Sequence, residues 1–236
     1  MIARSSLSVA ARLRRALGAL LLLITAGAGA GAGEAGLAGR VGASSAVVVG
    51  NLVYARTKTS KCFSDAFLRE VATQTPIAVA STFATIRSGE AAELARVGFA
   101  IMTGEGSFTL TPGERANLLA WCDRGGFLLA SASCSSPEWA ASFRAEAERI
   151  WGSGALVQLT GEHPVFHVLN DLGRLPTKSH EARFFGVIRD GRLVALFSPE
   201  GLNDTSSVDG CCCCGGNEVR QSRAMVANAL VYAITE

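Results

Sequence analysis

Four consecutive cysteines, Cys211 to Cys214, are the most unusual feature of this 236-residue chain. Neighbouring side chains of an extended segment point in opposite directions, so all four cannot face one ion. Two of them, joined by Cys134 or Cys62, could form a tetrahedral or trigonal thiolate site for zinc or copper(I). The run lacks the C-x-x-C spacing of zinc ribbons, however. The alternative is that the loop cysteines form disulfides with Cys134 and Cys62.

Cys134 is also a candidate nucleophile, because it lies between a predicted buried strand and the N-terminus of a predicted helix. A helix dipole at such a place lowers the pKa of a thiol and favours the reactive thiolate. A Cys–His hydrolase also needs a nearby histidine, and the chain offers His163, His167 and His180. We interpret 163–167 as a structural turn whose proline and phenylalanine pack inward. The residues around Cys134 lack the glycine elbow typical of a strained nucleophile turn.

Alternating strands and helices must position these residues. Short apolar runs bounded by turn residues predict strands over 46–55, 77–83, 98–103, 127–132, 155–159, 184–188 and 193–197. Capping residues and helical spacing predict helices over 64–73, 90–97, 111–124, 136–151 and 218–234. This alternation implies βαβ crossovers, and therefore an α/β fold with a mostly parallel sheet covered on both faces. Asp190-Gly191, between the last two strands, predicts a late antiparallel hairpin.

The carboxyl ends of parallel strands meet at one edge of a sheet, which is where ligands bind in such folds. We expect the chemically capable residues that follow the strands to lie there: Cys62, Glu105, Ser107, Cys134, Cys211, Cys212, Cys213, Cys214, Asn217 and Glu218. Cys122, beside Trp121 in the middle of a helix, is expected to be an ordinary core thiol. The segment 104–106 lacks the longer glycine pattern of a phosphate loop, so it is interpreted as a tight turn.

The first 33 residues have the three parts of a secretion signal. Arg4 to Arg15 is basic, Ala16 to Ala26 is apolar, and Gly27 to Gly33 offers small residues for cleavage. The apolar part is shorter than the roughly 20 residues that span a bilayer, so no transmembrane span beyond the signal is expected. The sequence therefore predicts export to the periplasm or the extracellular space, where disulfides persist, and a single domain over 41–236. An uncleaved N-terminal anchor is the alternative.

The charge balance changes when the signal is set aside. Four of the 22 Lys and Arg residues precede position 34 and none of the 20 Asp and Glu residues does, so 18 basic residues remain against 20 acidic ones. Such a near-neutral surface gives no reason to expect a nucleic-acid partner. The seven cysteines are an odd number, so at least one of them cannot be paired within the chain.

Several motifs, in order, resemble the bacterial family called domain of unknown function 4159. They are Met102–Leu110, Arg124–Ala130, Ser135–Trp139, His163–Phe166 and Asn228–Ala233. The resemblance covers most of the chain after the signal. It implies a flavodoxin-like three-layer sandwich, like that of the class I glutamine amidotransferases, and it implies no established activity.

This chain departs from a working glutaminase pattern at two places. No Gly-x-Cys-x-Gly elbow surrounds Cys134, and Val165 follows His163-Pro164 where such enzymes have a glutamate. We therefore expect a non-catalytic binding or assembly domain of unknown ligand, with an envelope protein as a candidate partner. The alternative is a thiol-dependent hydrolase or oxidoreductase that uses Cys134 or the Cys211–Cys214 loop. A third hypothesis is a structural component of an envelope complex, with disulfides that serve stability alone.

Overall fold

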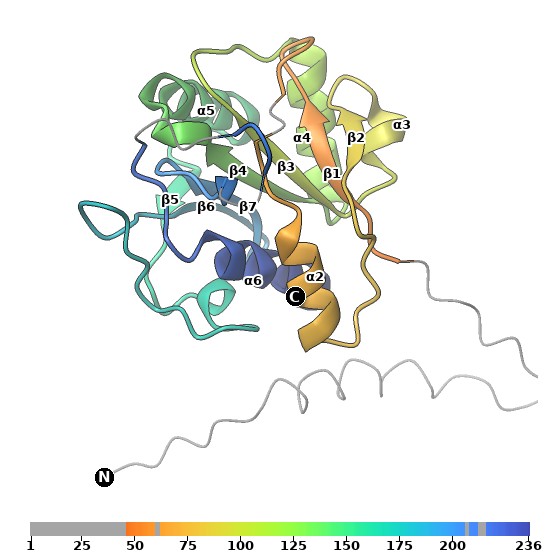
Figure 1. Cartoon of the computed structure of the whole chain (residues 1–236). Coiled ribbons are helices and arrows are strands. Elements are labelled where there is room, and N and C mark those ends of the chain that lie inside the picture. Colours follow the sequence, from red (N-terminus) through yellow and green to blue (C-terminus); the bar gives the residue numbers. More distant parts are fainter. Residues whose placement is uncertain (1–45, 60–61, 206–207, 212–215) are drawn as a thin grey trace, which may run out of the picture. The chain divides into compact units, whose positions relative to one another are not determined.

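A seven-stranded mixed sheet forms the centre of the domain (Figure 1). The computed structural model describes residues 46–59, 62–205, 208–211 and 216–236. The strand order is β2-β1-β3-β4-β7-β6-β5. The strands are β1 (Val49–Val53), β2 (Ala84–Arg87), β3 (Phe99–Gly104), β4 (Phe127–Ala132), β5 (Leu156–Gln158), β6 (Phe185–Arg189) and β7 (Arg192–Ser198). The predicted secretion signal lies outside the described residues and stays a prediction.

The strand directions confirm an α/β fold with a late antiparallel hairpin. β1 is parallel to β2 and β3, β3 is parallel to β4, and β4 is parallel to β7. β6 runs antiparallel to both of its neighbours, β5 and β7. The hairpin between β6 and β7 turns at Asp190 and Gly191, both of which have a positive φ, as the sequence predicts. Because β5 and β7 both oppose β6, β5 points the same way as β7 and the parallel strands.

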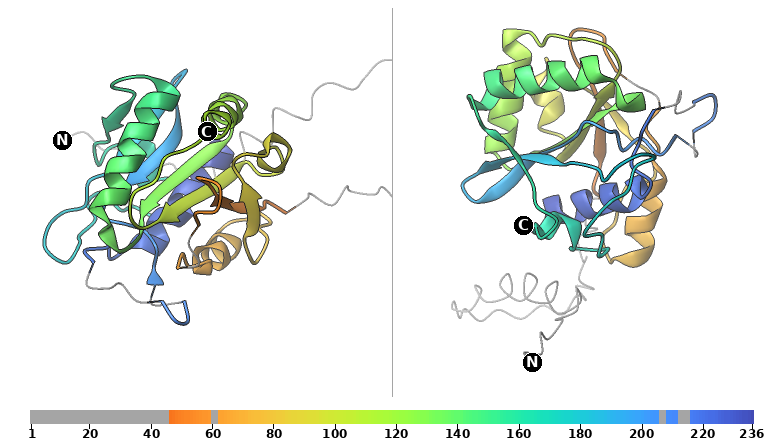
Figure 2. Two further views of the ribbon diagram at one scale, coloured as in Figure 1. Left: turned by 90° about the horizontal axis from the view of Figure 1, so that it is seen from above. Right: turned by 90° about the vertical axis from the view of Figure 1, so that its left-hand side faces the viewer.

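Helices cover both faces of the sheet, which gives the three-layer arrangement (Figures 1 and 2). One apolar core lies beneath α3 (Ala91–Leu94), α4 (Pro112–Asp123) and α5 (Pro137–Trp151). The second core lies beneath α2 (Ala66–Gln74) and α6 (Ser222–Thr235). Every residue of β3 and β4 is buried, because these two central strands contact a helical layer on each side.

The prediction of a strand over 77–83 is wrong. That segment makes a single parallel bridge, between Val79 and Val47, and the second strand of the sheet is 84–87 instead. In β2, Ile86 is buried whereas its neighbours Thr85 and Arg87 are exposed. This alternation is typical of an edge strand with one face in the core. The prediction selected 77–83 because this preceding segment is more apolar than β2.

Two helices after the central strands begin at the predicted caps. Thr111 accepts a hydrogen bond from the backbone N–H of Glu114, and the Glu114 carboxylate accepts one from the N–H of Thr111, which completes a capping box at α4. Ser136 accepts from the N–H of Trp139 at the start of α5, with a proline in the first turn. These caps fix the points at which the chain leaves the sheet edge.

A buried asparagine ties the ends of three neighbouring strands together. Asn203, which follows β7, donates to the Thr103 hydroxyl at 3.2 Å and to the Ser133 hydroxyl at 3.2 Å. Its carbonyl oxygen accepts from the Ser131 hydroxyl at 2.7 Å. Since Asn203 is fully buried, these bonds satisfy polar groups that would otherwise be stranded in the core. They also hold the loops after β3, β4 and β7 in register at the same edge.

Candidate functional site

The segments that follow the parallel strands lie together at one edge of the sheet, as the sequence predicts. We call this the strand-end edge, defined by Lys58, Cys62, Glu105, Ser107, Cys134, Ser135, His180, Glu200, Cys211, Asn217 and Glu218. Contacts between these segments, described below, connect residues that lie up to 149 positions apart in the chain. Cys122 is not among them, because it is buried within α4, where burial raises the pKa of its thiol to about 12. The prediction of a core thiol at Cys122 is confirmed.

A disulfide joins Cys62 to Cys211. It fastens the long loop after β7 to the segment after β1, two parts of the chain separated by 149 residues. Two hydrogen bonds strengthen this junction: Asn203 donates through its amide to the Cys62 carbonyl, and Ser64 donates through its N–H to the Asn203 carbonyl, both at 2.9 Å. The expected disulfide between the Cys-rich loop and Cys62 is therefore present. Cys212 to Cys214 lie outside the described residues.

Cys134 occupies a strained turn between β4 and α5. Its φ is 49° and that of Ser135 is 55°, so two successive residues that are not glycine lie in the left-handed region. Each such residue costs about 1–2 kcal/mol. This turn contains no glycine, as the sequence shows, and contacts from segments later in the chain compensate for the strain. The Cys134 N–H donates to the Glu218 carboxylate at 3.1 Å, and a Cβ on Gly216 would lie 2.7 Å from the Cys134 carbonyl oxygen.

Asn217 holds three segments of the strand-end edge together. Its N–H donates to the Ser135 hydroxyl at 2.7 Å, and that hydroxyl in turn donates to the Glu200 carbonyl at 2.7 Å. Its side-chain oxygen accepts from the backbone N–H groups of Lys178 and Ser179. Because the oxygen is taken by two donors, the amide nitrogen of Asn217 must face the remaining neighbour, which is a histidine.

That neighbour is His180, whose contacts indicate the tautomer of its neutral ring. The Asn217 amide donates to His180 Nδ1 over 3.0 Å, so Nδ1 must be an acceptor. The proton of the neutral ring is then on Nε2, which lies 3.3 Å from the carboxylate oxygen Oε1 of Glu200. Both ring nitrogens are therefore engaged within the protein. The Ser179 hydroxyl also lies 3.2 Å from Nδ1.

Glu200 is the buried acid of this group. It is 5% exposed, and its Oε1 faces His180 and, at 3.7 Å, the guanidinium of Arg183. Its second oxygen, Oε2, has no hydrogen-bond partner among the described residues. Arg144 adds positive charge near this carboxylate; it stacks over the Phe185 ring at 4.0 Å, where burial lowers its pKa and Arg183 lowers it further. Sequence reasoning missed Glu200 and Arg183, which no motif marks.

Glu105 and Ser107 remain on an exposed turn after β3. Lys58 approaches this turn and donates to the Ser107 carbonyl at 3.3 Å, and the N–H of Gly106 donates to the Ser136 hydroxyl at 3.0 Å. Gly106 has a positive φ, which fits the interpretation of 104–106 as a tight turn. The turn thus abuts the start of α5, next to the strained Cys134 turn.

The other two histidines serve local structure. His163 caps the short 3₁₀ helix 164–166, accepts from the N–H of Val165 at 3.2 Å, and burial lowers its pKa. Phe166 is buried, as predicted, but Pro164 is exposed, so the prediction that the proline also packs inward is wrong. His167 contacts the Asp171 carboxylate and the Gly161 carbonyl, each at 2.6 Å, and thereby braces the loop after β5.

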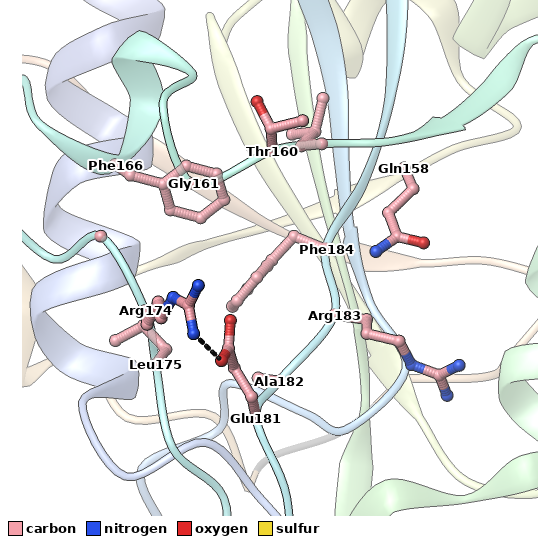
Figure 3. Close-up of a pocket in the computed structure, with 12 residues that line it drawn as sticks. Gln158, Thr160, Gly161, Phe166, Arg174, Leu175, Glu181, Ala182, Arg183 and Phe184 are labelled. Atoms are coloured by element: carbon pink, nitrogen blue, oxygen red, sulfur yellow. Dashed lines mark hydrogen bonds and ion pairs between the residues drawn. The ribbon is translucent and has the colours of Figure 1, made fainter.

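A pocket of about 420 Å³ opens beside the strand-end edge, in the loops after β5 and before β6 (Figure 3). Figure 3 shows Gln158 and Arg174 on opposite sides of it, with the Phe184 ring between them and the Phe166 ring on the same side as Arg174. Arg183 lines the pocket and also faces Glu200, so it connects the pocket to the strand-end edge. The sequence analysis did not predict this pocket.

Metal binding finds no support in the part of the chain that the structure describes. No group of three or more His, Cys, Asp or Glu residues there is placed to hold an ion. The disulfide occupies two of the candidate ligands, Cys62 and Cys211. Zinc or copper binding by the undescribed Cys212 to Cys214 stays a prediction.

The described residues also contain no helix with the length and apolar character needed to cross a bilayer.

The chain matches a family of known sequences. A family model described as "Domain of unknown function (DUF4159)" matches residues 52–234. The matched range begins within β1 and ends one residue before the end of α6, so it includes the whole strand-end edge and the pocket. No curated protein matched the chain.

Proposed function

Since the matching model covers most of the chain, this protein belongs to the DUF4159 family, and we propose that it is a non-catalytic binding or assembly domain working outside the cytoplasm. Its ligand or partner would meet the strand-end edge, the usual place for recognition in open α/β sheets. The disulfide between Cys62 and Cys211 fits an oxidising compartment.

The observation that carries this proposal is that the potentially reactive side chains form hydrogen bonds between loops of the protein. Both nitrogens of His180 and the hydroxyl of Ser135 are engaged in hydrogen bonds that fasten one loop to another. A general base needs a ring nitrogen within reach of the proton it removes, and the ring nitrogens of His180 contact Asn217, Glu200 and the Ser179 hydroxyl. The edge is therefore built as a rigid surface, which lowers the entropy cost of binding a ligand or partner.

The experiment is a turnover assay on the oxidised protein. Wild type, Cys134→Ala and His180→Gln would each be incubated with p-nitrophenyl acetate and, separately, with L-glutamine. Release of nitrophenolate or ammonia is expected to be the same for all three proteins. Catalytic release by the wild type that both variants lose would overturn the proposal.

One observation favours a second function, a thiol-dependent enzyme. Cys134 lies in a left-handed turn between a buried strand and a helix, and contacts from Glu218 and Gly216 maintain its strained backbone. Strain of this kind gathers at functional sites. The second function predicts that iodoacetamide alkylates Cys134 much faster than it alkylates free cysteine at the same pH, with the site identified by mass spectrometry. A rate equal to that of free cysteine rules it out.

A further inference from the structure

The pocket beside the strand-end edge has the charge and lining of a ligand site. We propose that it binds a small organic carboxylate with an apolar, ring-sized body. The inference rests on the proposed binding function and names the class of ligand. Three features carry it: the position of the pocket, the arginine that already holds a carboxylate there, and the aromatic residues that line it.

Its position is that of a ligand site in an α/β fold. Gln158 is the last residue of β5, which points the same way as β7, and the pocket begins at this carboxyl end. Ligands bind outside the carboxyl ends of the strands in such sheets. The volume of about 420 Å³ is near the lower end of the range for small-molecule pockets, which suits a compact ligand.

An arginine at the pocket already holds a carboxylate. Arg174 forms an ion pair with Glu181 at 3.4 Å, drawn as the dashed line in Figure 3. The two side chains are 85% and 54% exposed, so the pair is screened by water and contributes little to stability. A ligand carboxylate can take the place of Glu181, because a guanidinium binds any planar carboxylate through the same paired N–H groups.

The surrounding charges favour an anion. The charged residues that line the pocket are Arg174, Arg183 and Glu181, which leaves one net positive charge. Binding a single carboxylate would neutralise that charge. A phosphate ester carries more negative charge than this one positive charge can neutralise, and we therefore propose a carboxylate.

Part of the lining is aromatic. Phe166 and Phe184 pack edge to face with their ring centres 5.3 Å apart, and both are lining residues of the pocket. Phe166 is 2% exposed and Phe184 is 4% exposed, so a flat apolar body can contact only the parts of these rings that line the pocket. The exposed side chains of Gln158 and Thr160 stand at the rim and can donate hydrogen bonds to a ligand.

Benzoate is the probe that tests this. Titration of the ¹⁵N-labelled, oxidised protein with sodium benzoate at constant ionic strength is expected to give saturable shifts at the amides of Gly161, Gly173 and Phe184. Arg174→Gln should weaken benzoate binding about tenfold, since it removes a charge-assisted bidentate contact. Glu181→Gln should tighten binding severalfold, because it frees Arg174 from its internal partner.

The chain supplies a matched control at the other end of the sheet. A second pocket, of about 340 Å³, lies beside Gly98 and Gly126, which precede β3 and β4, and is also lined by two arginines and an aromatic residue. Arg124→Gln in that pocket should leave benzoate binding unchanged. Equal weakening by Arg124→Gln and Arg174→Gln, inorganic phosphate binding as tightly as benzoate, or absence of saturable shifts would each overturn the inference.

This outcome is separable from that of the proposed function. Turnover that depends on Cys134 would refute the non-catalytic role and leave benzoate binding untouched. Failure of benzoate to bind would refute the proposed ligand class of the pocket and would not change the result expected from the turnover assay. If circular dichroism shows that Arg174→Gln does not fold, the affinity of Glu181→Gln for benzoate still tests the inference. An affinity no higher than that of the wild type would overturn it.

Discussion

Replacing Cys62 by serine opens a covalent loop that spans most of the domain. The disulfide joins residues 149 positions apart. For a loop of this length, the loss of chain entropy in the unfolded state corresponds to about 5 kcal/mol at 25 °C, whereas measured contributions of disulfides are usually about 2–4 kcal/mol. We expect Cys62→Ser to lower the free energy of unfolding by about 3 kcal/mol. For a domain of this size, the Tm should fall by about 6–12 °C.

The assay is urea unfolding of the oxidised wild type and the oxidised variant, followed by tryptophan fluorescence. Both proteins are then measured again in dithiothreitol. The reduced forms should have equal free energies of unfolding, because only the disulfide distinguishes them. Cys62 is the better position to change than Cys211, since three cysteines follow Cys211 directly and offer replacement partners.

Two results would refute the reasoning. If oxidised Cys62→Ser unfolds within about 0.5 kcal/mol of oxidised wild type, the bond does not constrain the unfolded chain as calculated. If the reduced forms differ by as much as the oxidised ones, the serine itself disturbs the fold and the entropy argument loses its support.

Three further predictions concern buried or bridging polar groups. Tyr54→Phe removes the oxygen that accepts a hydrogen bond from the buried Trp139 indole at 2.6 Å, and should lower the free energy of unfolding in urea by about 1–3 kcal/mol. Trp139→Phe should lower it less in the Tyr54→Phe protein than in the wild type. Burial disfavours the charged form of Glu146, but hydrogen bonds from Arg115 and a neighbouring arginine outweigh it and lower the pKa of that carboxyl. Its stabilising contribution is therefore complete above the unfolded-state pKa of about 4.3 and is lost as the pH falls through the lower folded value, so Glu146→Gln should flatten the acid side of a stability–pH curve measured from pH 2 to 7. Asn217→Ala removes the acceptor of two backbone N–H groups, and should speed hydrogen exchange at residues 178 and 179 about tenfold while exchange in β3 stays unchanged.

The central strands could be predicted because burial on two faces leaves a plain pattern. The runs at 98–103 and 127–132 are continuously apolar, and the structure places β3 and β4 there to within a residue or two, every residue buried. The edge strand β2 was missed because it has few residues and alternates between the core and solvent. Its place depends on pairing with β1, a long-range contact that local composition does not report.

The gathering of chemically capable residues could be predicted, but their contacts could not. Parallel topology alone brings the carboxyl ends of the strands to one edge, so the nearness of Cys62, Cys134 and Cys211 could be expected from the alternation of strands and helices. Which of four cysteines pairs with Cys62 depends on the path of the loop. That path is set by contacts such as Asn217 with Ser135, which no spacing rule contains.

The strain at Cys134 and the pocket near Arg174 were beyond the reach of the sequence. A left-handed turn without glycine is stable only where neighbouring segments compensate for its cost, and here those segments are more than 80 residues away in the chain. The pocket is lined largely by an irregular stretch between 158 and 184, where no helical or strand period exists to interpret.

The bond between Cys62 and Cys211 also decides how the domain would carry mechanical load. Tension applied between residues 46 and 236 passes through the two sulfurs, so the chain from β2 to β7 is bypassed. In the oxidised form only β1, α6 and their flanking segments can be drawn out, and roughly 500 Å of contour length stays enclosed by the 149-residue separation. When the disulfide is reduced, this length of chain can again be extended by the applied force. A single covalent link therefore turns a sheet that could unravel strand by strand into one whose interior is shielded from force.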